Sequence, residues 1–205
     1  MKKFLLILLA VCLLAGFAGC SKADPQTEKP DPDVNQPTDK PDQDTDNKKT
    51  LVVYFSASGN TKAAAEKIAK ITGADIYQIL PAQPYSSADL NWHDSNSRTT
   101  HEQNDSSVRP EISSEKLDLT GYDTIYIGYP IWWGEEPRIM DTFVESYDFG
   151  DITMIPFCTS SSSGMGRSGK NLANNAKSGN WQDGKRFSES VSESELKSWI
   201  DNLNK

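Results

Sequence analysis

The stretch that decides the fold is Leu51-Val52-Val53-Tyr54-Phe55-Ser56-Ala57-Ser58-Gly59-Asn60-Thr61. Residues 51–55 are a short apolar run rich in Val and aromatic residues, the pattern of a buried β-strand. Small and polar residues follow, and a helical pattern runs from Lys62 to Ile71. A strand, a tight polar turn and a helix in this order point several backbone N–H groups at one place. We expect that place to bind an anion, most often phosphate; the alternative is an ordinary capped helix.

The residues of this turn suit a phosphate site. Hydroxyl donors come from Ser56, Ser58 and Thr61. Gly59 lets the backbone approach a ligand closely, and Asn60 tolerates unusual dihedral angles. The turn therefore offers neutral donors without a cationic side chain.

The chain beyond residue 50 alternates strands with helices, which is typical of an α/β sheet. Further strands are expected at 75–80, 123–128 and 152–158, with a short last strand over 181–187. A helix is expected to begin after Pro137, and a weaker one to cover 168–177. Ser192 and Glu195 form a capping box that opens a final helix. One face of that helix carries the apolar residues Leu196, Trp199, Ile200 and Leu203.

Three loops leave the carboxyl ends of the expected strands, at 56–61, 129–136 and 159–166. In an open parallel sheet, ligands bind beyond these ends, where the strand order reverses. The second loop reads Tyr-Pro-Ile-Trp-Trp-Gly from Tyr129 to Gly134, and the third begins Thr-Ser-Ser-Ser-Ser-Gly at Thr159. Together the three loops predict one site at this edge of the sheet.

The three loops, in this order, resemble the ligand-binding loops of the flavodoxin family. The resemblance extends over 51–205 and is closest to flavodoxin-like proteins that carry a Tyr-Pro-Ile-Trp-Trp loop and a long insert before the third strand. It implies an α/β flavodoxin-like three-layer sandwich, with a five-stranded parallel sheet in the order 2-1-3-4-5 and helices on both faces. It also implies FMN as the cofactor. No separate catalytic residue is expected, because no Ser-His-Asp or Cys-His set is evident.

The resemblance assigns cofactor-binding roles to three groups of residues. The phosphate would be held by Ser56, Ala57, Ser58, Gly59, Asn60 and Thr61. One side of the flavin ring would meet Pro130, Ile131, Trp132, Trp133 and Gly134. The other side would meet Thr159, Ser160, Ser161, Ser162, Ser163 and Gly164. Stacking of an indole on the ring would contribute about 0.5–1.5 kcal/mol beyond area burial, and Trp133 is the first choice, with Trp132 as the alternative. Beside the ring, Glu135 and Glu136 would disfavour a negatively charged reduced flavin and lower its potential.

A second phosphate-type motif lies at Gly164-Met165-Gly166-Arg167-Ser168-Gly169-Lys170. It spells both a dinucleotide fingerprint and most of a Walker loop. Asn171 stands where a Walker loop needs Ser or Thr for magnesium, and the fingerprint belongs after the first strand of its unit, not the fourth. We therefore favour the flavodoxin-like interpretation.

The segment 83–116 is long and polar, has no clear period, and receives no secondary-structure assignment. It holds both histidines, His93 and His101, together with Trp92. Because no carboxylate or cysteine stands at ligand spacing, we expect solvent-facing histidines and no metal site. A loop this long in a compact domain is often functional, so a lid over the site is one interpretation.

The N-terminus has the features of an export signal. Residues 1–19 comprise a charged start and an apolar run too short for a comfortable membrane span. The run ends Gly16-Phe17-Ala18-Gly19-Cys20, which resembles the bacterial lipoprotein box and implies lipid attachment at Cys20; an ordinary signal peptide is the alternative. Residues 20–49 are polar and proline-rich and cannot bury a core, so they are expected to be a disordered tether for a domain over 50–205.

Composition limits the partners. The chain has 205 residues, 36% of them hydrophobic, enough for one sizeable domain with extensions. A formal net charge of -8 argues against nucleic acid and against an anionic membrane surface as partners. If Cys12 is removed with the signal and Cys20 is lipidated, Cys158 has no partner for a disulfide within one chain.

These features together predict a lipid-anchored, exported FMN protein that carries electrons between redox proteins or small donors and acceptors. One alternative is an NAD(P)H-dependent quinone or flavin reductase of the same fold. Another is a non-catalytic exported protein that binds flavin or another phosphorylated ligand.

Overall fold

The computed structural model describes residues 49–203. The export signal, Cys20 and nearly all of the expected tether lie outside this part of the chain. Within it, no helix is long and apolar enough to cross a membrane.

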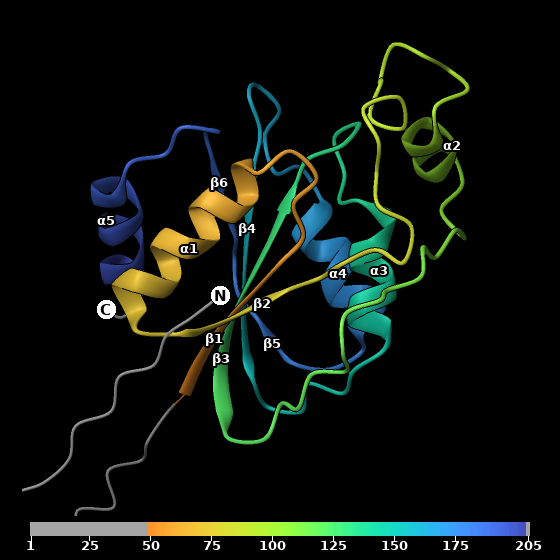
Figure 1. The fold of residues 1–205 in the computed structure, drawn as a ribbon. Coiled ribbons are helices and arrows are strands. Elements are labelled where there is room, and N and C mark those ends of the chain that lie inside the picture. The colour runs from red at the N-terminus through yellow and green to blue at the C-terminus, as the bar shows by residue number, and fades with distance from the viewer. Residues whose placement is uncertain (1–48, 204–205) are drawn as a thin grey trace, which may run out of the picture. The chain divides into compact units, whose positions relative to one another are not determined.

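The domain is built on one parallel sheet (Figure 1). Its central strands are β1 (Lys49–Tyr54), β3 (Tyr122–Pro130) and β4 (Thr153–Thr159), all apolar through their middles. With β2 (Asp75–Gln78) and β5 (Asn180–Trp181), the order is β2-β1-β3-β4-β5, as the resemblance implies. All strand pairs are parallel, so the carboxyl ends of β1, β3 and β4 share one edge of the sheet.

Two helices cover each face of the sheet, which gives three layers (Figure 1). One face is packed by α1 (Asn60–Thr72) and α5 (Glu193–Leu203), with Ile68 and Leu196 fully buried. The other is packed by α3 (Arg138–Glu145) and α4 (Ser168–Ala176), with Phe143 and Leu172 buried. Alternate residues of β1 point to opposite layers, as the two-residue period of a strand requires: Leu51 and Val53 to the α3 side, Val52 and Tyr54 to the α1 side.

The expected last strand over 181–187 is wrong as a single element. It consists of β5 and β6 (Lys185–Phe187), which pair with β4 on either side of Pro156. The β4 residues that bond to this edge are even-numbered, since Gln182 N donates to Met154 O and Ser160 N donates to Phe187 O. Pro156 faces the same edge without an N–H to offer, so the ladder is interrupted there.

Other boundaries differ by a few residues. Strand β2 ends at Gln78 rather than Leu80, and α1 begins at Asn60. The Ser192 hydroxyl accepts from Glu195 N at 3.2 Å, as the expected cap requires. Leu203, expected on the buried face of α5, is 36% exposed because it occupies the last turn of the helix.

The unassigned segment contains one helix, α2 (Arg98–Asn104), set apart from the four helices that cover the sheet (Figure 1). Its buried side chains are polar, which explains the missing hydrophobic period; they are Thr99, Thr100, Glu102 and Gln103. Both histidines of the segment are exposed, and no group of metal-binding side chains occurs in the described residues 49–203.

Candidate functional site

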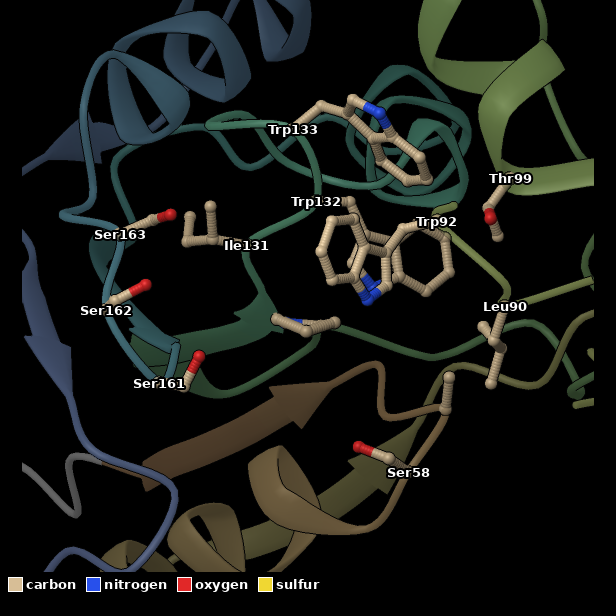
Figure 2. Close-up of a pocket in the computed structure, with 12 residues that line it drawn as sticks. Ser58, Leu90, Trp92, Thr99, Ile131, Trp132, Trp133, Ser161, Ser162 and Ser163 are labelled. Atoms are coloured by element: carbon tan, nitrogen blue, oxygen red, sulfur yellow. The ribbon is translucent and has the colours of Figure 1, made fainter. Parts of the chain in front are cut away.

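A cavity of about 480 Å³ lies beyond the carboxyl ends of β1, β3 and β4. Its volume falls within the range of small-molecule sites, roughly 300–1,000 Å³. A smaller cavity of about 180 Å³ adjoins it and shares Ser58, Trp132 and Ser161 among its lining. Figure 2 shows the larger cavity, with Ser161, Ser162 and Ser163 on one side and the indoles of Trp132, Trp133 and Trp92 on the other.

The first wall is the turn between β1 and α1. Gly59 stands at the helix N-cap with φ 93°, a left-handed conformation that glycine adopts without strain. Its N–H donates to the Ser56 Oγ at 3.1 Å, which closes the turn. The first intrahelical donor of α1 is Ala63 N, so the preceding N–H groups of 60–62 have no partner within the helix. Ser58, just before these groups in the chain, lines both cavities, and Asn60 lines the smaller one.

The second wall is a tight turn after β3. Trp132 and Glu135 exchange both backbone hydrogen bonds at 3.0 Å, which leaves Trp133 and Gly134 as a two-residue turn. Both residues have positive φ, 50° and 84°, as a type I′ turn requires. The conformation is easy for Gly134 and unfavourable for a bulky aromatic residue such as Trp133.

The two indoles of this turn have different surroundings. Trp132 makes edge contacts to Phe55 and Tyr85, with ring centroids 5.6 Å and 5.3 Å apart. Trp133 is 45% exposed. Both line the larger cavity, so both candidates for the ring contact remain in place.

The third wall is the serine-rich loop after β4. Arg186 shapes this loop, since one guanidinium nitrogen donates to Ser160 O at 2.6 Å and to Ser161 O at 2.9 Å. Thr159 is joined to Thr61 by a hydroxyl–hydroxyl bond of 2.7 Å, which ties the first and third walls together. The exposed hydroxyls of Ser161, Ser162 and Ser163 therefore stand on a loop fixed from behind.

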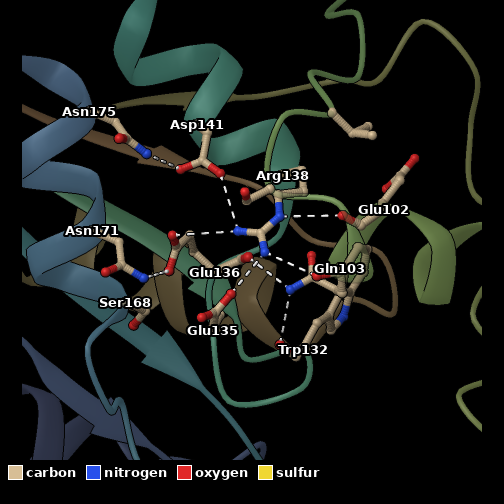
Figure 3. Close-up of polar contacts among 12 residues, drawn as sticks. Glu102, Gln103, Trp132, Glu135, Glu136, Arg138, Asp141, Ser168, Asn171 and Asn175 are labelled. Atoms are coloured by element: carbon tan, nitrogen blue, oxygen red, sulfur yellow. Dashed lines mark hydrogen bonds and ion pairs between the residues drawn. The ribbon is translucent and has the colours of Figure 1, made fainter.

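A buried charge network supports the second wall (Figure 3). Arg138 lies 2.9 Å from Glu135 Oε2, 4.0 Å from Glu136 Oε1 and 3.6 Å from Asp141 Oδ2. Glu136 is only 1% exposed and accepts from Asn171 Nδ2 at 3.2 Å. Loss of water around it raises the pKa of the Glu136 carboxyl to about 7, the main cause being burial.

This network changes the expectation for Glu135 and Glu136. They were expected to present two solvated negative charges to the ring. Glu136 instead lies within the protein, with its charge disfavoured by burial, and Arg138 pairs with Glu135. Their effect on a bound reduced ligand is therefore weaker than two free carboxylates would produce.

Helix α2 belongs to the long segment 83–116, here called the insert, and it bonds to the same network. Gln103 Nε2 donates to Trp132 O and to Glu136 O, both at 3.2 Å, and Arg138 donates to Glu102 O and Gln103 O. Leu90, Trp92 and Thr99, all from the insert, line the larger cavity. The insert is thus a fourth wall.

Most expected site residues meet at the cavities. Those lining one or both are Ala57, Ser58, Asn60, Pro130, Ile131, Trp132, Trp133, Thr159, Ser160, Ser161, Ser162 and Ser163. Five others lie elsewhere. Ser56 lines a neighbouring cavity, Gly59 and Gly134 shape their turns, Thr61 is buried behind the wall, and Gly164 lies outside the lining. The motif at Gly164–Lys170 leads into α4, where Asn171 bonds to Glu136.

Sequence reasoning missed Leu90, Thr99 and the ring contacts of Tyr85. A signal existed in Trp92, a large aromatic residue in an otherwise polar segment. No pattern in the sequence around Gln103 indicated that its side chain would hydrogen-bond to the turn at Trp132.

The donor set defines what the site can bind. Backbone N–H groups and serine hydroxyls suit an anion at one end, and the indoles suit a flat apolar ring at the other. Among the described lining residues of both cavities, Glu189 alone is charged, so an anion here would be held by neutral donors.

Fold and site define a doubly wound α/β protein that binds its ligand at the carboxyl edge of a parallel sheet. A profile of the flavodoxin family matches residues 49–203. The chain belongs to the flavodoxin family.

Solved structures agree with this assignment. A candidate flavoprotein from Bacteroides eggerthii DSM 20697 is 43% identical, over 78% of this chain and 99% of its own, with a TM-score of 0.72. A second, from Bacteroides uniformis ATCC 8492, is 46% identical over 75% and 98%, also with a TM-score of 0.72. A flavoprotein from Lactobacillus acidophilus NCFM, solved with FMN, shares the fold at 24% identity over 77% and 99%, with a TM-score of 0.60. No curated protein matches the chain significantly.

Proposed function

We propose that this protein binds FMN and transfers electrons through it. Membership of the flavodoxin family supports FMN as the ligand, as does the related fold solved with FMN. The observation that carries the proposal is the meeting of three loops, after β1, β3 and β4, at one cavity with neutral donors and indoles.

Different residues would bind the phosphate and the ring of FMN. The N–H groups at the start of α1 and the Ser58 hydroxyl would hold the phosphate. Trp132 and Trp133 would cover the ring and exclude water from it, while the loop at Ser161–Ser163 would supply hydroxyls to its polar edge. When bound, FMN supplies the electron-transfer chemistry, and the protein sets its orientation and electrostatic surroundings.

The direct test is an absorbance scan of purified residues 49–205 mixed with FMN, followed by titration with FMN and with riboflavin. Hydrogen bonds to a charged group contribute about 1.5–3 kcal/mol each. Riboflavin has no phosphate and loses several of them, so its affinity should be lower than that of FMN by at least a few hundredfold. Equal affinities, measured by quenching of flavin fluorescence, would show that no phosphate is held.

A charge variant sharpens this test. Ser58→Glu places a negative charge at the phosphate end and should weaken FMN while leaving riboflavin nearly unchanged. Ser198→Glu, at an exposed position of α5 outside both cavity linings, is the matched control for charge alone. Equal losses of FMN affinity in both variants would contradict the assignment of the phosphate end to Ser58.

Electron transfer needs its own measurement. We expect bound FMN to be reduced and reoxidised reversibly, without steady consumption of NADH or NADPH by the protein alone. Steady consumption would identify a reductase, and a flavin that cannot be reduced at accessible potentials would identify a binding protein.

We also propose that the protein is exported and held at the membrane by lipid on Cys20. The support is the sequence at 16–20 and the polar stretch that follows it. One acyl chain anchors only marginally, so stable attachment would require full lipoprotein processing.

A further inference from the structure

We propose that Trp92 contacts the bound ring system. This contact comes from the insert, which forms the fourth wall of the cavity, and not from any of the three loops at the edge of the sheet. This inference rests on the proposed FMN site. It assigns to the insert the role of closing the cavity over a flat, electron-poor aromatic ligand.

The first observation is the exposure of Trp92. Its side chain is 67% exposed, although it lines the larger cavity together with Trp132 and Trp133. Among the aromatic rings of residues 49–203, only that of His93 contacts it, with ring centroids 3.4 Å apart. A large apolar side chain left open at the mouth of a cavity gains most by covering a ligand there.

The second observation is that the third wall carries no aromatic residue. Thr159 to Gly164 presents only small side chains, of which Ser161, Ser162 and Ser163 line the cavity. All aromatic surface in the lining therefore comes from the turn at Trp132–Trp133 and from Trp92. All three indoles lie on the side of the cavity opposite the serines (Figure 2), so the insert enlarges the aromatic surface that a ring would meet there.

The third observation is that the insert holds Trp92 in place. Asp89 accepts from Ser86 N and Oγ at 2.8 and 2.7 Å, and its carbonyl accepts from Thr99 N and Oγ1 at 3.2 and 2.6 Å. Trp92 lies between Asp89 and Thr99, and these bonds fasten the start of that stretch to α2. Helix α2 is in turn bonded through Gln103 to the turn at Trp132. Trp92 and Trp133 are thus positioned by one connected set of hydrogen bonds.

The test compares FMN binding by the wild type, Trp92→Ala and Trp92→Phe. Removal of one stacked indole should weaken the affinity for FMN by roughly three- to thirtyfold, and Trp92→Phe should lose less affinity than Trp92→Ala. Bound FMN should also become more fluorescent in Trp92→Ala, because an indole in contact with a flavin quenches its emission. Ile76→Ala is the control, since Ile76 is 46% exposed on β2 and lies outside the cavity lining.

The outcomes separate the two proposals. If the wild type fails to bind FMN, the proposed function falls and this inference falls with it. If the wild type binds and Trp92→Ala binds equally well with unchanged bound-state fluorescence, the inference alone is overturned. Thermal unfolding of each ligand-free variant should match the wild type, because an exposed side chain contributes little to folding. A loss of affinity accompanied by an equal loss in Ile76→Ala would likewise overturn it.

Discussion

Trp133 is a strained residue at the site. Its φ of 50° is costly for any L-residue, by about 1–2 kcal/mol, and the surrounding turn must maintain it. Glycine follows at the next position, where φ of 84° costs nothing. An aromatic residue placed where glycine would be easier points to a role for its side chain.

Two substitutions at Trp133 separate strain from binding. Both Trp133→Ala and Trp133→Gly should weaken the binding of oxidised FMN by about 0.5–3 kcal/mol, because both remove the indole. The glycine variant should be more stable to unfolding than the alanine variant by about 1 kcal/mol, because only alanine keeps the strain. Chemical denaturation and flavin titration measure the two effects.

Reduction adds negative charge to the flavin, and an electron-rich indole opposes it. Loss of the indole should therefore raise the potential for the second electron by some tens of millivolts, given about 1.4 kcal/mol for each 59 mV. If neither affinity nor potential changes, the ring contact passes to Trp132.

Glu136 predicts a pH dependence of stability. Its pKa is raised from 4.5 to about 7 in the folded protein, chiefly by burial. Between these values the folded state binds a proton that the unfolded state has released. The resulting stability is fully present below pH 4.5 and is lost as pH rises through about 7.

Glu136→Gln should remove this dependence. The variant should gain stability relative to the wild type between pH 5 and 8, by something on the order of 1–3 kcal/mol. Urea unfolding at several pH values measures the difference. Glu135→Gln is the control, because it removes the same charge from the neighbouring position, where the side chain is half-exposed. Parallel pH profiles for wild type and Glu136→Gln would refute the assignment.

At the scale of elements, α2 depends on polar contacts to keep its place. Gln103 provides two of them, to Trp132 O and Glu136 O. Each such bond contributes about 0.5–1.5 kcal/mol. Gln103→Ala should therefore increase amide hydrogen exchange in α2 and weaken FMN binding, without unfolding the sheet.

The matched control is Gln182→Ala. The Gln182 side chain bonds locally, to Asn180 O at 3.2 Å, in the exposed connection between β5 and β6. It should leave exchange in α2 unchanged. If Gln103→Ala also leaves exchange unchanged, the bonds to Trp132 and Glu136 are not what holds the insert.

The elements that sequence predicted well are those that local pattern determines. Strands β1, β3 and β4 are apolar runs with polar or glycine boundaries, and α1 ends at Gly73 with φ 69°. Helix α2 could not be predicted, because tertiary hydrogen bonds replace an apolar face. The break between β5 and β6 depends on Pro156 in a neighbouring strand, which no pattern within 181–187 contains.

The site shows the same division. The three loops were predictable because each follows an apolar strand, and the fold brings such ends together. The contributions of Trp92 and Gln103 were not, since they depend on how a patternless insert is anchored. The burial of Glu136 reflects the path of the chain after the turn, and adjacency to Glu135 gave no indication of it.

In the molecule as a whole, Cys20 and Cys158 are predicted to differ completely in reactivity. Cys158 is buried in β4, and burial raises the pKa of its thiol to about 12, so it should be unreactive. Cys20, outside the described residues, is the proposed lipid site. Cys20→Ala should abolish labelling by a fatty-acid analogue in the producing cell, and Cys158→Ala should not. Labelling that survives Cys20→Ala would end the proposal.

The interruption at Pro156 also affects how copies of this protein behave beside one another. An unbroken edge strand offers a row of free N–H and C=O groups onto which another chain can add. Here one edge is split into pieces of two and three residues, and on the other side β2 has four residues before the Pro81–Ile112 bridge takes over. Neither edge is long enough to template a neighbouring sheet. If the proposed lipid anchor gathers copies of the protein on one surface, we expect them to remain separate molecules, each with its site open to passing partners.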